Sequence, residues 1–237
     1  RRENPSIPRP SGLTLPPMTE SLPHWYLLGA GNMGTLAAWY LTRAGHTVSI
    51  VTDNPQPPLH KQLFFADQSV SLTLSCASPE QLPATITHLL VASKTPYTEA
   101  ALRRVKGHLS DKTLVLRFQN GMGALDGRLP AGTAVLEAIT TSAVKGQSPQ
   151  HTIVAENTTW LGGTQQPPEW RKGLQRHWPD LHWEADIRFV QWKKLVANAV
   201  INPLTALHDV PNGAVVDDPA LQQEARALCA EADTLLT

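Results

Sequence analysis

The sequence predicts an α/β protein in which a mostly parallel sheet, with helices on both faces, is followed by a purely helical segment. Two observations carry this prediction. Short apolar runs alternate with helix-like stretches over residues 24–186, which is the pattern of strand–helix–strand units. Over residues 187–237 the apolar residues follow helical spacing only. We therefore place a domain boundary at Asp186 and expect a second, helical domain to begin at Ile187.

Composition excludes several classes of function. The chain has 237 residues, 41% of them hydrophobic, so it can fill a core of ordinary size. Its formal net charge of zero gives no reason to expect a nucleic-acid or membrane-surface partner. No window approaches the roughly 18 consecutive apolar residues of a membrane-spanning helix. Cys76 and Cys229 are far apart, and no Cys or His spacing suits a metal, so we expect a cytoplasmic protein without a metal site.

The first 23 residues differ in composition from the rest. They contain six prolines and lack the apolar stretch of a secretory signal. We expect residues 1–23 to be a disordered leader, with Met18 as a candidate native start.

The first organised segment carries a glycine-rich turn between a strand and a helix. Its parts are an apolar run (Trp25–Gly29), the turn itself (Gly29–Gly34), a helical stretch to Ala44 and a second strand (Thr47–Val51). In this context G-x-G-x-x-G is the fingerprint of a Rossmann-type dinucleotide site. Gly29 permits the turn, Gly31 lets a pyrophosphate approach the backbone, and Gly34 lets the helix pack on the strand. The alternative is a glycine-rich turn in some other α/β protein.

Asp53 stands at the end of the second strand. An acidic side chain there would hydrogen-bond the ribose 2′-hydroxyl of NAD, whereas an arginine would favour NADP. The alternative is that Asp53 simply opens the Asp-Asn-Pro turn that follows.

Two polar residues stand at the carboxyl ends of later strands. Lys94 follows a buried strand at His88–Ala92, and Asn120 follows one at Thr113–Arg117. Parallel sheets place ligands at these ends, so we expect both residues near a cofactor or substrate. A solvated lysine and a turn asparagine are the alternatives. The other expected helices are one that ends at about Gly107 and one at 168–176. We also expect short strands or a hairpin within 62–75 and strands at 134–139, 151–155, 158–162 and 181–185, of which the middle two are antiparallel.

The helix expected from Ile187 carries costly polar groups on an apolar segment. Lys194, Asn198 and Asn202 are spaced by four residues, so they share one face. The other faces are apolar, and we therefore expect a helix buried nearly all round and perturbed at Pro203. An unpaired buried amide costs roughly 1–3 kcal/mol, so these side chains need partners in the protein or a ligand.

The last segment is a second helix. A polar turn at 209–213 precedes it, Asp218 is the expected N-cap and Pro219 the first helical residue. It runs to Thr237, and two helices cannot close a core by themselves. We therefore expect the helical domain to be incomplete in these residues.

Several motifs together resemble those of the ketopantoate reductase (2-dehydropantoate 2-reductase) family. They are Gly29–Gly34, Lys94 after its strand, Gln119-Asn-Gly-Met-Gly123, the run Trp192–Ala206 and Pro211-Asn212-Gly213. The resemblance covers roughly residues 24–237, and its Lys-x-x-x-Asn-x-x-x-Asn-Pro motif is far more specific than the glycine fingerprint. It implies a Rossmann-type domain before an all-helical, 6-phosphogluconate dehydrogenase-like domain. The implied activity is NADPH-dependent reduction of 2-dehydropantoate to pantoate, on the route to pantothenate and coenzyme A.

The resemblance also assigns roles to residues. It makes Lys194 the proton donor, while Asn198, Asn202 and Asn212 hold the carboxylate and hydroxyl groups of the keto acid. Asn120 would touch both substrate and cofactor. The expected cofactor-binding residues are Gly29, Ala30, Gly31, Asn32, Met33, Gly34, Asp53, Lys94, Asn120 and the backbone near Val144. A monomer or a homodimer is expected.

Two departures from the family pattern qualify this expectation. Where the family commonly carries an arginine for the 2′-phosphate, this chain has Asp53, so NADH is a second candidate beside NADPH. The helices that bring a serine and a glutamate to the family's site are absent from these residues. Two alternatives therefore stay open: a related reductase of another keto acid or imine, and a catalytically silent NAD(P)-binding module.

Overall fold

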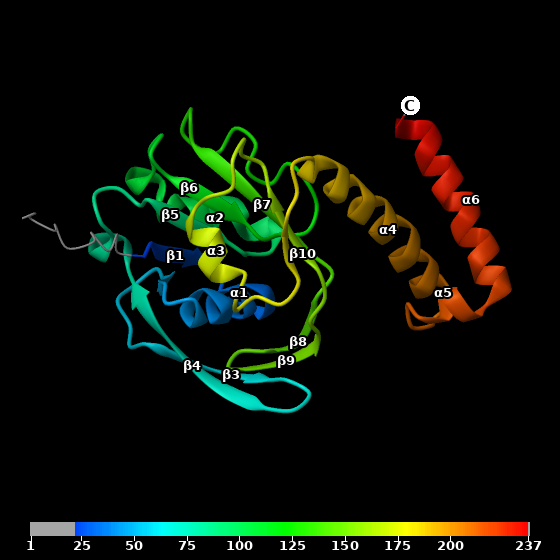
Figure 1. The fold of residues 1–237 in the computed structure, drawn as a ribbon, viewed down its shortest axis with the longest axis horizontal. Helices are drawn as coiled ribbons and strands as arrows, with labels where there is room; N and C mark the ends of the chain where they lie inside the picture. Colours follow the sequence, from blue (N-terminus) through cyan, green and yellow to red (C-terminus); the bar gives the residue numbers. More distant parts are fainter. Residues whose placement is uncertain (1–21, 237) are drawn as a thin grey trace, which may run out of the picture.

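The structure, a computed structural model, describes residues 22–236. The expected leader lies outside the described residues, apart from Leu22 and Pro23. Figure 1 shows a twisted sheet with helices packed on its faces, and an arm of helices that extends from one side of it. In the described part of the chain the strands form one sheet in the order β11-β10-β7-β6-β5-β1-β2-β4-β3-β9-β8.

The centre of the sheet is parallel and doubly wound, as the sequence predicts. All neighbours in the series β7-β6-β5-β1-β2-β4 are parallel. The chain passes from β1 to β2 on one side and later to β5 on the other, so the winding reverses between β1 and β5. Ligands bind beyond the carboxyl ends of strands at such a point. The bounds are β1 His24–Leu28, β2 Thr47–Val51, β4 Ser69–Ala77, β5 His88–Val91, β6 Leu114–Arg117 and β7 Ala134–Thr140.

Antiparallel pairs extend the sheet at both edges. β3 forms the expected hairpin with β4, β9 is antiparallel to β8, and β10 is antiparallel to β7. The strands expected at 151–155 and 158–162 are therefore present, but they lie at opposite edges of the sheet. β8 was not expected, because its mostly exposed residues show no apolar pattern. The bounds are β3 Leu59–Phe64, β8 Ala143–Gln147, β9 Gln150–Ala155, β10 Thr159–Gly162 and β11 Leu181–Trp183.

Each face of the parallel strands has its own apolar core. Leu27 of β1 packs in one core together with residues of α1 and α3, whereas Leu28 packs in the other with residues of α2. Both leucines are fully buried, because a strand covered on both faces buries consecutive side chains. The helices are α1 Asn32–Arg43, α2 Thr98–Arg103 and α3 Trp170–Leu174, with 3₁₀ turns η1 Pro79–Gln81, η2 Thr95–Tyr97 and η3 Lys106–His108.

The helical arm begins where the sequence predicts. Its helices are α4 Ile187–Leu207, α5 Ala214–Asp217 and α6 Pro219–Leu236. Asp186 caps α4 by accepting a hydrogen bond from the Phe189 N–H (3.3 Å), and Asp218 accepts one from the Ala220 N–H (2.8 Å). α4 continues through Pro203 to Leu207, and α6 runs back along it (Figure 1). No helix in the described part is long and apolar enough to cross a membrane.

The expectation that α4 is buried nearly all round is wrong. One face packs on β7 and β10 near its start and on α5 and α6 toward its end. On the opposite side Ala199 and Pro203 are exposed, and the residues Phe189 and Leu207 are 56% and 79% exposed. Among the described residues no further element packs extensively on this side. An apolar pattern reports which residues favour burial, but it does not supply the partner that buries them.

The half-buried His88 makes the stability of the fold depend on pH. Its ring lies 4.9 Å from that of Trp25, and burial, together with the charge of His46, lowers its pKa from 6.5 to about 4. The folded protein therefore prefers the neutral ring. The stabilisation is complete above pH 6.5 and is lost as the pH falls toward about 4.

We expect the free energy of unfolding of His88→Phe to fall less between pH 7 and pH 4 than that of the wild type, because phenylalanine keeps the aromatic contact and binds no proton. Urea unfolding at several pH values measures this. His60→Phe, which replaces an exposed histidine of β3, should keep the wild-type slope. If the free energies of unfolding of His88→Phe and the wild type change equally with pH, the proposed effect of the lowered His88 pKa is wrong.

Candidate active site

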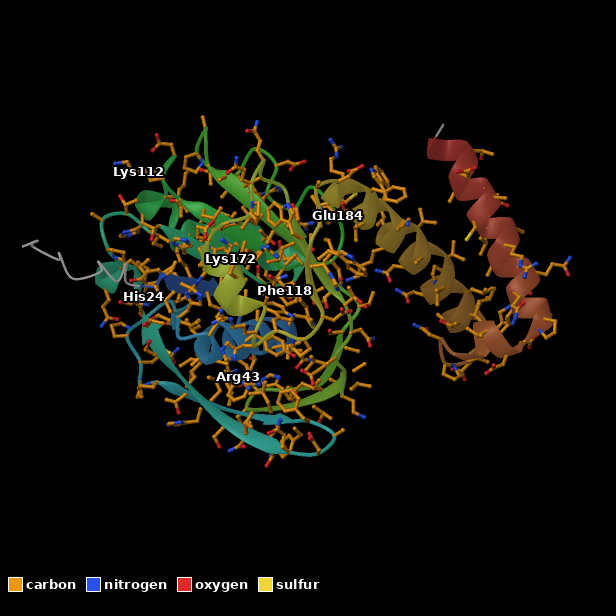
Figure 2. All side chains as sticks on the ribbon, in the orientation of Figure 1. His24, Arg43, Lys112, Phe118, Lys172 and Glu184 are labelled. Atoms are coloured by element: carbon orange, nitrogen blue, oxygen red, sulfur yellow. The ribbon has the colours of Figure 1, made fainter. Side chains whose placement is uncertain are left out.

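A pocket of about 610 Å³ opens where α4 meets the carboxyl ends of β6 and β7. All five residues with expected substrate roles line it, although they come from three separate stretches of the chain. They are Asn120, Lys194, Asn198, Asn202 and Asn212, and Met33 of the glycine loop joins them. Figure 2 places Phe118, another wall residue, within the body of the molecule, and Glu184 close to the start of α4. The pocket therefore lies at the junction between the sheet and the helical arm.

Lys194 is held at this junction by two acceptors. Its Nζ donates to the carbonyl oxygen of Thr140 (2.6 Å), at the end of β7, and to Oδ1 of Asn120 (3.0 Å), just after β6. Neither acceptor carries a full charge. Burial lowers the pKa of the ammonium, and the charge of Arg117 lowers it further. A lysine in such a setting gives up its proton more readily than one in water.

The asparagines add amide groups to the same wall. Oδ1 of Asn212 lies 3.0 Å from the hydroxyl of Thr205, which fixes the 209–213 turn against α4. The side chains of Asn198 and Asn202 make no hydrogen bond within the described residues, and both face the pocket. Their donors and acceptors are thus available to a polar ligand.

The geometry of the glycine loop matches the role of each glycine in the fingerprint. Gly29 has φ of +98°, and a Cβ there would lie 2.4 Å from the backbone nitrogen of Ser93. A Cβ on Gly34 would lie 1.9 Å from the carbonyl oxygen of Gly29, so only glycine lets α1 pack this closely on β1. Gly31 has open space around it. With no acidic residue in the first turn of α1 and no side-chain cap, the loop and helix start fit an anionic pyrophosphate.

Residues of the edge strands β3, β8 and β9 contact the glycine loop on the side of the sheet edge. Nζ of Lys61 donates to the carbonyl oxygen of Ala30 (3.0 Å). Asn32 donates to the carbonyl oxygen of Val144 (3.3 Å), and its Oδ1 lies 2.7 Å from Nδ1 of His151. The backbone of Val144, which we expected at the cofactor, thus contacts the glycine loop through Asn32.

Lys61 was missed by the sequence reasoning, although the sequence held a signal for it. The side chain is 2% exposed, and burial lowers its pKa. In a strand, alternate residues share one face, so Lys61 lies on the same side as Leu59 and Leu63. A lysine between two apolar residues at this spacing indicates a buried ammonium that needs acceptors.

Two sequence models of one family match the chain. Ketopantoate reductase PanE/ApbA matches residues 25–166, and the C-terminal model of the same family matches residues 186–237. The chain belongs to the ketopantoate reductase family. It is thereby an oxidoreductase, and the enzymes of this family depend on NAD(P).

Named relatives support the assignment. The chain is 29% identical to the 2-dehydropantoate 2-reductase of Vibrio cholerae, over 88% of this chain and 76% of the relative. It is 31% identical to that of Shigella flexneri, over 86% and 68%.

Solved structures of ketopantoate reductases share the fold. A probable 2-dehydropantoate 2-reductase of Bacillus subtilis superposes with a TM-score of 0.73 at 23% identity, covering 90% of this chain and 76% of that one. A ketopantoate reductase of Staphylococcus aureus, described as dimeric, gives 0.71 at 19% identity, covering 87% and 76%.

The remaining expected cofactor residues lie outside the pocket. Lys94 is exposed after β5, and its side chain has no polar partner among the described residues. Asp53 is also exposed, and both its oxygens accept hydrogen bonds from Arg104, at 2.5 and 2.8 Å. Arg104 follows α2, 51 residues further along the chain, so nothing in the local sequence could pair it with Asp53. The structure thus places a guanidinium beside the aspartate that stands where the family commonly has an arginine.

The second and third glycines of the fingerprint, Gly31 and Gly34, give a matched test of the loop. Gly34→Ala should lower the free energy of unfolding by roughly 3 kcal/mol, because the new methyl group overlaps the Gly29 carbonyl. Gly31→Ala should change it by less than about 0.5 kcal/mol. It should instead weaken binding of the reduced dinucleotide, tested with both NADPH and NADH, about tenfold or more, because the methyl group occupies the approach of the pyrophosphate. Urea unfolding and a fluorescence titration with each dinucleotide measure these effects. Unchanged binding by Gly31→Ala would overturn this location of the pyrophosphate.

Proposed function

We propose that this protein reduces 2-dehydropantoate to pantoate with NADPH, and so serves the synthesis of pantothenate and coenzyme A. The proposal rests chiefly on the Lys194 ammonium, which is held at one pocket wall beside Asn120, Asn198 and Asn202. A bound reduced nicotinamide would supply hydride to the 2-keto carbon. The names of the relatives support the choice of substrate.

In this proposal the residues of the chain stabilise and protonate the developing alkoxide. Lys194 neutralises the negative charge on the oxygen and then transfers its proton to that oxygen. Asn198, Asn202 and Asn212 hold the carboxylate and hydroxyl groups, and amides do so without adding charge. Asn120 orients the ammonium through its Oδ1. We further propose that residues 24–186 form the dinucleotide-binding domain and that the substrate domain begins at Ile187.

Removing the proposed proton donor should abolish most of the turnover. Lys194→Ala is expected to lower kcat/KM for 2-dehydropantoate by roughly 10²- to 10⁴-fold, the usual contribution of a positioned acid. Lys193→Ala is the matched control, since the ammonium of Lys193 lies over the ring of Phe189 (4.2 Å). It should lose much less activity. Loss of reduced-nicotinamide absorbance measures both, and wild-type-like turnover by Lys194→Ala would refute the mechanism.

The wild-type rate should also report the ionisation of Lys194. The ammonium form donates the proton, so kcat should fall as the pH rises through the lysine pKa. Because burial and the Arg117 charge lower that pKa, the fall should begin below the pH range of an ordinary lysine. A pH profile of kcat that stays flat through this range would contradict the role.

Arg104 supports NADPH as the cofactor. We propose that its guanidinium lies at the 2′-phosphate position, where Asp53 both holds it and competes with the phosphate. Asp53→Ala should therefore raise the ratio of kcat/KM with NADPH to that with NADH by roughly tenfold, about 1.4 kcal/mol. Arg104→Leu should lower the ratio by a similar factor. Arg103→Leu, which removes an exposed arginine paired with Glu99, is the control and should leave the ratio unchanged. A ratio insensitive to both Asp53 and Arg104 would contradict the assignment.

A further inference from the structure

A buried ion pair lies directly behind the pocket. Arg117 ends β6 and Glu137 is its partner on β7, and the guanidinium Nε donates to the carboxylate over 2.6 Å. The side chain of Arg117 is 2% exposed and that of Glu137 is 19% exposed. Neither residue entered the site expected from the sequence.

This pair contacts the two elements that carry the proton-donating lysine and its partner. Nη2 of Arg117 donates to the carbonyl oxygen of Gly121 (2.8 Å), the residue after Asn120. The side chain of Gln191, three residues before Lys194 on α4, lies beside Glu137 and opposes the rise that burial causes in the pKa of its carboxyl group. One end of the pair thus holds the 119–121 turn, and the other faces α4.

Stability alone does not account for the pair. A buried ion pair is often no more stable than an apolar pair of the same volume, because both charges lose their hydration. In this protein Nη1 of Arg117 is buried without a hydrogen-bond partner among the described residues, which adds to the cost. Because this ion pair costs folding free energy and lies next to the Lys194 ammonium, it indicates a role at that ammonium.

We propose that Arg117 is a positioning residue of the reductase site. Anchored by Glu137, its guanidinium fixes the Asn120–Gly121 turn, so that the Asn120 carboxamide meets the Lys194 ammonium, and it places a positive charge behind that ammonium. The inference rests on the proposed role of Lys194. It goes beyond that role by assigning the orientation and the charge environment of the lysine to a residue that lies outside the pocket.

The electrostatics agree with this geometry. After burial, the charge of Arg117 is the second cause of the lowered pKa of Lys194. Burial raises the pKa of Glu137, and Arg117 opposes that rise. Of the other elements packed on α4, β10 has no ionisable group and α5 has Asp217. α6 carries Glu224, which pairs with His208, and also Arg226, Cys229, Glu231 and Asp233. On α4 itself Lys193 is the adjacent charge.

The test variant removes both charges, because Arg117→Met alone would leave Glu137 buried without its partner. In Arg117→Met/Glu137→Gln we expect kcat to fall about tenfold or more, since a small misplacement of a catalytic group costs that much. The alkaline limb of the pH profile should also move to higher pH. A merely structural pair would not move that limb.

Arg117→Lys is the matched conservative variant. It keeps the positive charge but cannot reach Glu137 and Gly121 together with a planar fork. We expect its alkaline limb to stay near that of the wild type while kcat remains reduced. If the double variant does not fold, the kcat of Arg117→Lys still tests the positioning role of Arg117.

A readout without turnover separates this inference from the proposed function. The pKa of Lys194 can be followed by NMR of ¹³Cε-labelled lysine, with its signal assigned by its loss in Lys194→Arg. We expect a higher pKa in the double variant than in the wild type. An unchanged pKa and an unchanged kcat in a folded double variant would overturn the role of Arg117. If the wild type fails to reduce 2-dehydropantoate, the proposed function is wrong. The NMR titration still shows whether Arg117 lowers the pKa of Lys194.

Discussion

The site depends on holding one ammonium, partly out of water, between two strand ends and a helix. The acceptors of Lys194 are a carbonyl at the end of β7 and a carboxamide just beyond β6, and neither carries a full charge. A carboxylate partner would hold the proton more tightly, whereas open water would leave the pKa of the lysine at its ordinary value. The position of α4 against the sheet therefore sets the hydrogen-bond partners and the lowered pKa of this lysine.

The same requirement explains how the polar groups around the site are arranged. Arg117 and Glu137 lie behind the pocket wall, and Lys61 lies behind the glycine loop, so buried charges support both halves of the site. Arg117 and Lys61 each donate to a backbone carbonyl oxygen of a turn that must keep its shape, Arg117 to that of Gly121 and Lys61 to that of Ala30. Charge-assisted hydrogen bonds to a turn restrict it more strongly than neutral ones. The cost of burying these groups is consistent with a site that must be organised before a ligand arrives.

The helical arm contributes differently from the sheet. α4 supplies the polar stripe with one face, while much of its opposite face is exposed in the described part of the chain. The asparagines of the stripe are thus placed by the start of the helix, where it packs on β7 and β10, and by the turn that carries Asn212. The positions of these asparagine side chains in the pocket therefore depend on few contacts.

The sequence by itself determined the doubly wound sheet, the glycine loop, the start of α4 at Ile187 and the polar spacing along it. Each of these follows from local rules: apolar periodicity, the steric needs of a tight turn and the four-residue repeat of a helix. Only the tertiary structure decided that Asp53 meets Arg104, that Lys61 and His151 support the loop, and that Arg117 and Glu137 lie behind Lys194. It also decided how much of α4 is covered. These contacts join residues 20 to 119 positions apart, and no local pattern specifies which distant strand will lie beside another.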